Sequence, residues 1–197
     1  MEKHLALFDF DGTLTRKDTL FDFARFAVGE MAFVGRLLRA APVLILHKAG
    51  MVGATAAKES FLTTFFGGWA EARFEAAAVA YCTDRLPALL QPEAMHRLAW
   101  HLAQGHEVVI VSASAEDWIR PWASAMGLEV LATQLERHQG KITGKLASPN
   151  CNGPEKVARI QARFPMVADA ITYAYGDSAG DQPMLGLANH AFFRKFV

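Results

Sequence analysis

The chain has 197 residues, of which 52% are hydrophobic, 20% charged and 11% aromatic. This composition supplies enough apolar side chains for a buried core and excludes a disordered or low-complexity protein. Twenty basic residues balance 20 acidic ones, and this neutral net charge argues against a general nucleic-acid binder, because phosphate contacts dominate the affinity of such proteins.

Neither the cysteines nor the apolar segments indicate secretion or a membrane span. Cys82 and Cys151 provide no disulfide framework, and the N-terminus lacks the apolar segment and cleavage site of a signal peptide. The most apolar region, 31–57, is interrupted by basic residues and a proline, and its uncharged stretches, such as 40–46, are far shorter than the ~18–20 residues that a span requires. We therefore expect a cytoplasmic protein.

The first part of the chain predicts one strand followed by a block of helices. Residues 5–10 form a short apolar run that ends in an Asp-Gly-Thr turn, which is typical of a buried strand. From about 19 to 82 no strand alternation appears, and apolar residues recur at helical spacing. We therefore expect an α/β core from residues 1–16 and 84–197 and an inserted helical cap from residues 17–83.

The remainder of the chain alternates helices with strands. Glycines end or precede the helical segments, and the strand-like segments between them are apolar and rich in β-branched residues. This alternation predicts an α/β fold with a doubly wound parallel sheet. The pattern predicts helices at 92–104, 114–126 and 153–162, strands at 107–111, 128–133, 171–175 and 191–193, and a hairpin around Leu135 and Ile142.

Polar side chains follow three of the predicted strands. Asp9 and Asp11 end the first strand, Ser112 ends the next, and Asp177 ends a later one, so all of them should meet at one edge of the sheet. Residues two apart on a strand share a face, which directs both carboxylates outward while Phe10 points into the core. Two carboxylates ~4 Å apart repel by roughly 4 kcal/mol at an effective dielectric of 20, so a cation or a shared proton is needed between them.

These acids predict a magnesium site. Asp177 and Asp181 bring two further carboxylates to the pair formed by Asp9 and Asp11. Carboxylate oxygens without a histidine or cysteine cluster select Mg²⁺ over zinc. Two alternatives stay open at this point, because Asp11 and Gly12 could form a simple turn and Asp181 could cap the helix that follows it.

Lys156 and Ser112 are the candidate ligands of an anion. Lys156 lies in the first turn of its helix, where the helix dipole disfavours a cation by ~0.3–1 kcal/mol. It is therefore either a solvated surface lysine or a cation directed at a bound anion, and an alanine there should lower turnover while slightly stabilising the helix. Ser114, with Asp117 three residues on, is better placed to cap the next helix, which leaves Ser112 free to donate to a phosphoryl oxygen.

These residues together resemble a known family. The segments 9–15 and 176–181, with Ser112 and Lys156 between them, resemble in order and spacing the four motifs of haloacid dehalogenase superfamily phosphatases. The resemblance covers nearly the whole chain. The helical block and the segment 150–156 resemble the phosphoserine phosphatase-like branch of that superfamily.

The resemblance implies a Mg²⁺-dependent phosphatase that forms an aspartyl-phosphate. Asp9 would attack phosphorus, and Asp11 would protonate the leaving alcohol and then deprotonate a water. Ser112 and Lys156 would bind the phosphoryl oxygens. Gly12, Thr13 and Ala113 would complete the phosphate site, and Mg²⁺ would be held by Asp9, the backbone carbonyl of Asp11, Asp177 and Asp181.

The implied substrate is a small phosphorylated metabolite. Phosphoserine phosphatases of this type have a glutamate nine residues after the nucleophile, where this chain has Asp18, and their cap arginine has no clear counterpart here. These two departures argue against phosphoserine itself as the substrate. As an alternative, the basic and apolar cap residues 36–48 resemble phosphatidylglycerophosphate phosphatases and could touch a membrane surface weakly. A receiver-type signalling module is a third reading, against which Asp11 and the inserted cap argue.

Overall fold

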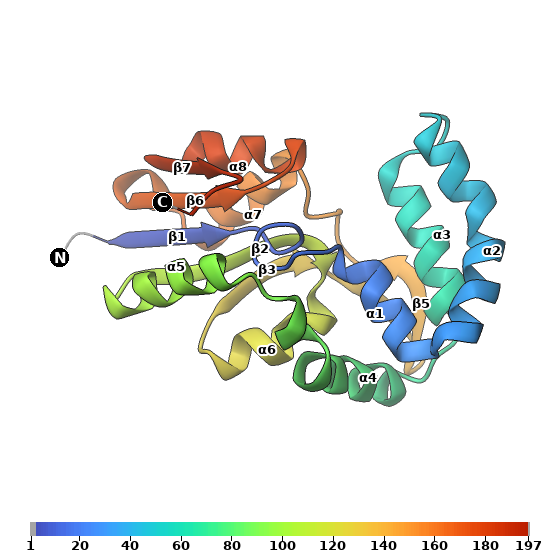
Figure 1. Ribbon diagram of the computed structural model, residues 1–197. Helices are drawn as coiled ribbons and strands as arrows, with labels where there is room; N and C mark the ends of the chain where they lie inside the picture. Colours follow the sequence, from blue (N-terminus) through green and yellow to red (C-terminus); the bar gives the residue numbers. More distant parts are fainter. Residues whose placement is uncertain (1–2, 197) are drawn as a thin grey trace.

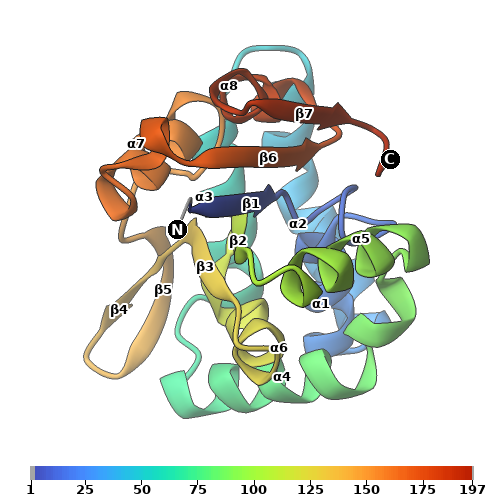
Figure 2. The same cartoon turned by 90° about the vertical axis from the view of Figure 1, so that its left-hand side faces the viewer.

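A parallel sheet of five strands forms the centre of the molecule. The computed structural model describes residues 3–196. The strands lie in the order β3-β2-β1-β6-β7, and every neighbouring pair is parallel, as can be followed in Figure 2. The predicted doubly wound sheet is confirmed. The strands are β1 (His4–Phe8), β2 (Glu107–Ala115), β3 (Glu129–Thr133), β6 (Ile171–Gly176) and β7 (His190–Phe193).

Each face of the sheet is covered by its own helices. Alternate residues of β1 enter different apolar clusters, with Ala6 and Phe8 in one and Leu5 and Leu7 in the other. This alternation follows from the two-residue period of a strand. The first cluster includes residues of α5 (Pro92–Ala103) and α6 (Arg120–Ala125), and the second includes residues of α7 (Pro154–Arg163) and α8 (Gln182–Leu187).

A block of four helices stands between β1 and β2 in the sequence. It lies beside the carboxyl ends of the strands, on the right of Figure 1. Buried phenylalanines fill its interior, and Phe23 stacks on Trp118 at the boundary with the sheet layer. The helices are α1 (Thr19–Val28), α2 (Glu30–Lys48), α3 (Ala54–Phe66) and α4 (Glu71–Asp84).

The predicted hairpin is confirmed, and it packs on the helical block. It consists of β4 (Leu135–His138) and β5 (Lys141–Leu146), which form a separate two-stranded sheet. The amide of Gly68 donates to the carbonyl of Ile142, whose own amide donates to the carbonyl of Trp69. Gly144 lies against the backbone of Thr63 with a positive φ of 86°, so a side chain there would overlap α3.

Two predicted boundaries are wrong near the strand ends. The first strand ends at Phe8 rather than at residue 10, because the chain bends towards Gly12, which has a φ of 80°. The second strand continues to Ala115, so no helix begins at Ser114 and its hydroxyl caps none. A 3₁₀ turn, Glu116–Trp118, precedes α6 instead. Among the described residues, no helix combines the length and apolar character that crossing a bilayer requires.

Candidate active site

The carboxyl ends of the strands open into a cleft of about 380 Å³ that faces the helical block. Thr13 lies just beneath the cleft, with its hydroxyl 3.5 Å from an oxygen of Asp177. The structure therefore brings the predicted site residues together in one place. The cleft is lined by Asp9, Asp11, Gly12, Ser112, Ala113, Lys156, Asp177 and Asp181, and further by Arg16, Lys17, Asp18, Leu20, Lys58, Ser114, Asn152 and Ser178.

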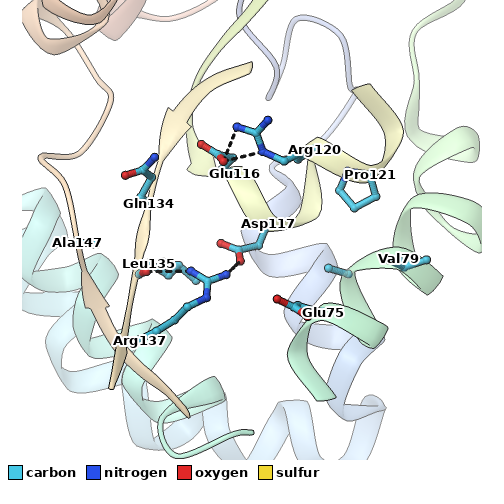
Figure 3. A pocket seen from close by; sticks show the side chains of 11 residues that line it. Glu75, Val79, Glu116, Asp117, Arg120, Pro121, Gln134, Leu135, Arg137 and Ala147 are labelled. Carbon is cyan, nitrogen blue, oxygen red and sulfur yellow. Dashed lines mark hydrogen bonds and ion pairs between the residues drawn. The ribbon is translucent and has the colours of Figure 1, made fainter. Parts of the chain in front are cut away.

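A larger cavity of about 470 Å³ lies elsewhere, between α4, α6 and the hairpin (Figure 3). Four of its five charged side chains are matched with one another, and the fifth is Glu75. Arg137 pairs with Asp117, and Arg120 pairs with Glu116. Within the described residues it holds no cluster of acids like the one at the strand ends.

Lys156 is buried at the floor of the cleft and is not a surface lysine. Its side chain is 1% exposed, and its Nζ lies 2.6 Å from Oδ1 of Asp9 and 2.6 Å from Oδ1 of Asp181. The third donor of the ammonium reaches the carbonyl of Val111 at 2.7 Å. Although burial lowers the pKa of Lys156, the two carboxylates outweigh it and hold this pKa above its ordinary value. Two of the three donors thus hold Asp9 and Asp181, and the third ties the ammonium to β2.

Asp9 is an unusual carboxylate because it is buried among other charges. Burial and the charge of Asp181 raise its pKa to about 7 against the opposing effect of the Lys156 ammonium. One oxygen of Asp9 is held by Lys156, and the residue lines the cleft. A carboxylate in this setting gains from any additional cation that enters the cleft.

Asp11 is held by two donors from distant parts of the chain. Its Oδ1 accepts the amide of Thr19 at 2.6 Å, at the start of α1, and its Oδ2 accepts the hydroxyl of Ser114. Burial raises the pKa of Asp11 to about 6, the charge of Asp18 adds to this, and the two hydrogen bonds oppose it. A pKa near neutral suits a group that must both give and take a proton.

The hydrogen bond from Ser114 gives a testable consequence. Because it stabilises the carboxylate form, Ser114→Ala should raise the pKa of Asp11 above its value of about 6. The limb of the kcat–pH profile on which Asp11 must be deprotonated to act as a base should move to higher pH. At pH 6, kcat should therefore fall roughly ten-fold. Ser124→Ala, on the exposed side of α6, is the matched control and should leave the profile unchanged. An unshifted limb in Ser114→Ala would separate Asp11 from proton transfer.

Asp177 and Asp181 complete an acidic cluster with Asp9. One oxygen from each of the three carboxylates lies within 4.8 Å of the others. Asp181 also accepts from the amides of Asp177 and Ser178, so it stabilises its own loop and does not cap α8. Burial and the charge of Asp181 raise the pKa of Asp177. Gly12 lies against the Asp177 carboxylate, and a Cβ there would overlap it.

The charges in this cleft fit a divalent cation. Among the buried and half-buried residues of the cleft, four acids face two cations, which leaves an excess of two negative charges. The acids are Asp9, Asp11, Asp177 and Asp181, and the cations are Lys156 and Lys58. Within the described part of the chain, the Asp177 carboxylate accepts only the weak contact from Thr13, so its oxygens are open towards the cleft. All of these donors are hard oxygens, which suits Mg²⁺. The side chain of Asp11 is engaged by Thr19 and Ser114, so its predicted part in a metal site would fall to its backbone carbonyl.

Ser112 and Ala113 lie at the end of β2 beside these acids. The hydroxyl oxygen of Ser112 accepts the amide of Ser114 at 3.0 Å, which leaves the hydroxyl proton for another acceptor. Ser112 is buried and lines the cleft. A donor in this position can bind an anionic oxygen at the cleft floor.

Lys58 is the main cleft residue that sequence reasoning missed. It comes from α3 and donates to the carbonyl of Ala113 at 2.8 Å and to Oδ1 of Asn150 at 2.6 Å. No carboxylate lies within ion-pair distance of it in residues 3–196, and burial lowers its pKa. No local pattern marks this lysine, because its partners are 55 and 92 residues away. It links the helical block to the end of β2, next to Ser112.

The molecule combines acids at the ends of parallel strands, a buried lysine among these acids and a helical block beside the cleft. Together these features define a phosphatase-like α/β hydrolase architecture. The pattern that characterises the haloacid dehalogenase-like hydrolases matches residues 6–186. The chain belongs to this family, and the predicted family membership is confirmed.

Several known proteins are similar over nearly the whole chain. The protein CicA of Caulobacter vibrioides is 36% identical over 202 residues, which cover 99% of this chain and 87% of the relative. A Mycobacterium tuberculosis protein named as a probable phosphatase is 30% identical over 192 residues, covering 94% and 67% of the two chains.

Solved structures share the fold. A Bordetella pertussis protein of unknown function superposes with a TM-score of 0.78 and 26% identity, covering 94% of this chain and 87% of that one. A phosphoserine phosphatase solved with an analogue of a phospho-aspartyl intermediate gives a TM-score of 0.66 at 20% identity, with 95% and 84% covered. At that identity the likeness establishes the fold alone.

Proposed function

We propose that this chain is a Mg²⁺-dependent phosphatase that hydrolyses a phosphate monoester through a phosphorylated Asp9, with residues 17–83 as its cap. The observation that carries the proposal is the convergence of three groups in one cleft. Asp9 is held by a buried lysine, Asp11 has a pKa of about 6, and Ser112 has a free hydroxyl proton. Family membership and the relative named as a probable phosphatase support it.

The first half of the reaction uses Asp9 and Asp11. A carboxylate oxygen of Asp9 attacks phosphorus, and the bond from phosphorus to the substrate's alcohol oxygen breaks. Protonated Asp11 gives its proton to that oxygen, so the product leaves as a neutral alcohol. Lys156 keeps the attacking carboxylate in place, and Ser112 donates to a phosphoryl oxygen.

The second half releases phosphate. Asp11, now a carboxylate, takes a proton from a water whose oxygen attacks phosphorus, and the bond from phosphorus to Asp9 breaks. Asp9 and protonated Asp11 are thereby restored. When bound by Asp9, Asp177, Asp181 and the Asp11 carbonyl, Mg²⁺ would neutralise charge on the phosphoryl group and on the acids that face it.

The metal requirement has its own test. Hydrolysis of p-nitrophenyl phosphate should stop in EDTA and return with Mg²⁺, and Mg²⁺ should raise the melting temperature. Asp177→Asn removes the carboxylate that is open to the cleft, so it should raise the Mg²⁺ concentration for half-maximal activity at least about ten-fold. Asp169→Asn, at an exposed acid, is the control. Full activity in EDTA would refute the metal site.

The rim of the cleft favours a small anionic metabolite as the substrate. Arg16, Lys17 and Lys58 line it and supply positive charge around the leaving group. Asp18, the residue expected to meet the ammonium of phosphoserine, instead caps α1 by accepting the amide of Leu20 at 2.8 Å. This use of Asp18 weakens the case for phosphoserine. The free, buried cysteines are in keeping with a cytoplasmic site of action.

One observation favours a lipid phosphate as a second candidate. A cavity of about 360 Å³ shares Lys17 and Asp18 with the cleft and is lined by the apolar side chains of Phe21, Phe33 and Leu37. It offers room for an apolar extension of the leaving group. Comparing kcat/KM for phosphatidylglycerophosphate vesicles with that for a panel of soluble phosphorylated metabolites separates the two classes. A receiver-type switch would turn over neither.

A further inference from the structure

Helix α2 carries an apolar face that nothing in the described chain covers. Met31, Val34, Leu38 and Ile45 are spaced so that they share one side of the helix, and we call them the α2 stripe. Their exposed fractions are 92%, 50%, 71% and 67%. Met51, in the turn after the helix, is 73% exposed. The other side of α2 packs inward through Phe33 and Ala40, so the helix is apolar on both faces.

The α2 stripe lies at the outer edge of the molecule. In Figure 1, α2 is the helix farthest from the sheet, with α3 between it and the carboxyl ends of the strands. Exposed apolar side chains scattered singly are ordinary, but an aligned row of large ones marks a surface that meets an apolar partner. None of the four residues lines the catalytic cleft.

The charge around the α2 stripe is mainly positive, because the one acid of the helix, Glu30 at its start, is paired with Arg25. At 100° per residue, Arg39 lies on one flank of the stripe and Lys48 on the other, and both are exposed. Arg36 faces the packed side, where it donates to the carbonyl of Phe65. From residue 31 to residue 57 the sequence contains no aspartate or glutamate. An apolar row edged by cations is the pattern of helices that lie in a membrane interface.

We infer that the α2 stripe docks this protein on an anionic lipid surface. The apolar side chains would enter the interface between headgroups and acyl chains, while Arg39 and Lys48 would meet anionic headgroups. The charge pattern favours a lipid surface over a second copy of the chain as the partner of the α2 stripe. Two α2 helices paired along their stripes would bring like charges together on both flanks, which disfavours such a pair.

The inference is tested by flotation of the full chain with vesicles. Vesicles of phosphatidylcholine with 30% phosphatidylglycerol should carry the protein upward, and raising the salt concentration should weaken binding. Leu38→Glu/Ile45→Glu should reduce the bound fraction at least ten-fold. Val79→Glu, at a 53% exposed position of α4, is the matched control and should bind as the wild type does. Arg39→Gln/Lys48→Gln should abolish the preference for the anionic vesicles.

Hydrolysis of p-nitrophenyl phosphate by the same variants separates this inference from the proposed reaction. Unchanged turnover in Leu38→Glu/Ile45→Glu shows that the fold and the cleft are intact. The inference is wrong if the wild type does not bind the anionic vesicles or if the double glutamate variant binds as well as the wild type. It is also wrong if sedimentation velocity shows a dimer that these substitutions dissociate, because the stripe would then be occupied by a second copy.

Discussion

Asp9→Asn is expected to reduce phosphatase turnover by roughly 10⁴-fold or more, since it removes the nucleophile while keeping the side-chain volume. The fold should persist, because Lys156 retains Asp181 and the carbonyl of Val111 as partners. Steady-state kinetics with p-nitrophenyl phosphate in Mg²⁺ gives the rate, and thermal unfolding gives the stability.

The direction in which Asp9→Asn changes the stability of the fold can also be predicted. The folded chain raises the pKa of Asp9 from 3.8 to about 7, so the contribution of this residue to stability is present below pH ~4 and is lost as the pH rises through about 7. In EDTA at pH 8, Asp9→Asn should therefore melt no lower than the wild type. Asp84→Asn, at an exposed acid, is the control for both measurements. Turnover near the wild-type rate in Asp9→Asn would remove Asp9 from the chemistry.

Lys156→Met should damage both stability and activity. Methionine keeps most of the volume but leaves the buried carboxylates of Asp9 and Asp181 without their cation. Removing one partner of a buried ion pair costs about 3–5 kcal/mol. For a chain of this size such a loss lowers the melting temperature by roughly 6–20 °C. Turnover should fall with it, because the attacking carboxylate loses the group that positions it.

Two further variants keep this prediction testable. Lys145→Met breaks the exposed pair with Glu59 and should cost about 1 kcal/mol or less. Lys156→Met/Asp181→Asn removes one of the stranded charges and should recover part of the lost stability without restoring activity. If Lys156→Met instead melts at or above the wild-type temperature, the buried pairs do not contribute as the structure indicates.

The parallel sheet could be predicted because its signals are local. The alternation of Leu5 and Leu7 with Ala6 and Phe8 indicates a strand buried on both faces, and the strands fold into the sheet that this pattern requires. The candidate acids could be found for the same reason, since they directly follow those strands. The hairpin was also predictable, because Gly140, with a φ of 70°, supplies its turn.

The environment of each site residue could not be predicted, because its partners are far away in the sequence. From its place at the start of a helix, Lys156 could be a solvated lysine or a cation directed at an anion, and the structure shows that it lies against Asp9, 147 residues earlier. This contact reverses the expectation that replacing Lys156 would slightly stabilise the helix. Ser114 reads as a helix cap, yet its hydroxyl is used by Asp11, 103 residues away. Long-range pairing outweighed the local preference in both cases.

The most direct test of this account is an acid quench of the enzyme during turnover of a labelled phosphate monoester with Mg²⁺, followed by mass spectrometry of its peptides. The account predicts one phosphoryl group, attached to Asp9, that forms within the time of a single turnover, decays at a rate compatible with kcat and is absent in Asp9→Asn. A phosphoryl group on another residue, or a phosphorylated Asp9 that persists far longer than one turnover, would contradict it.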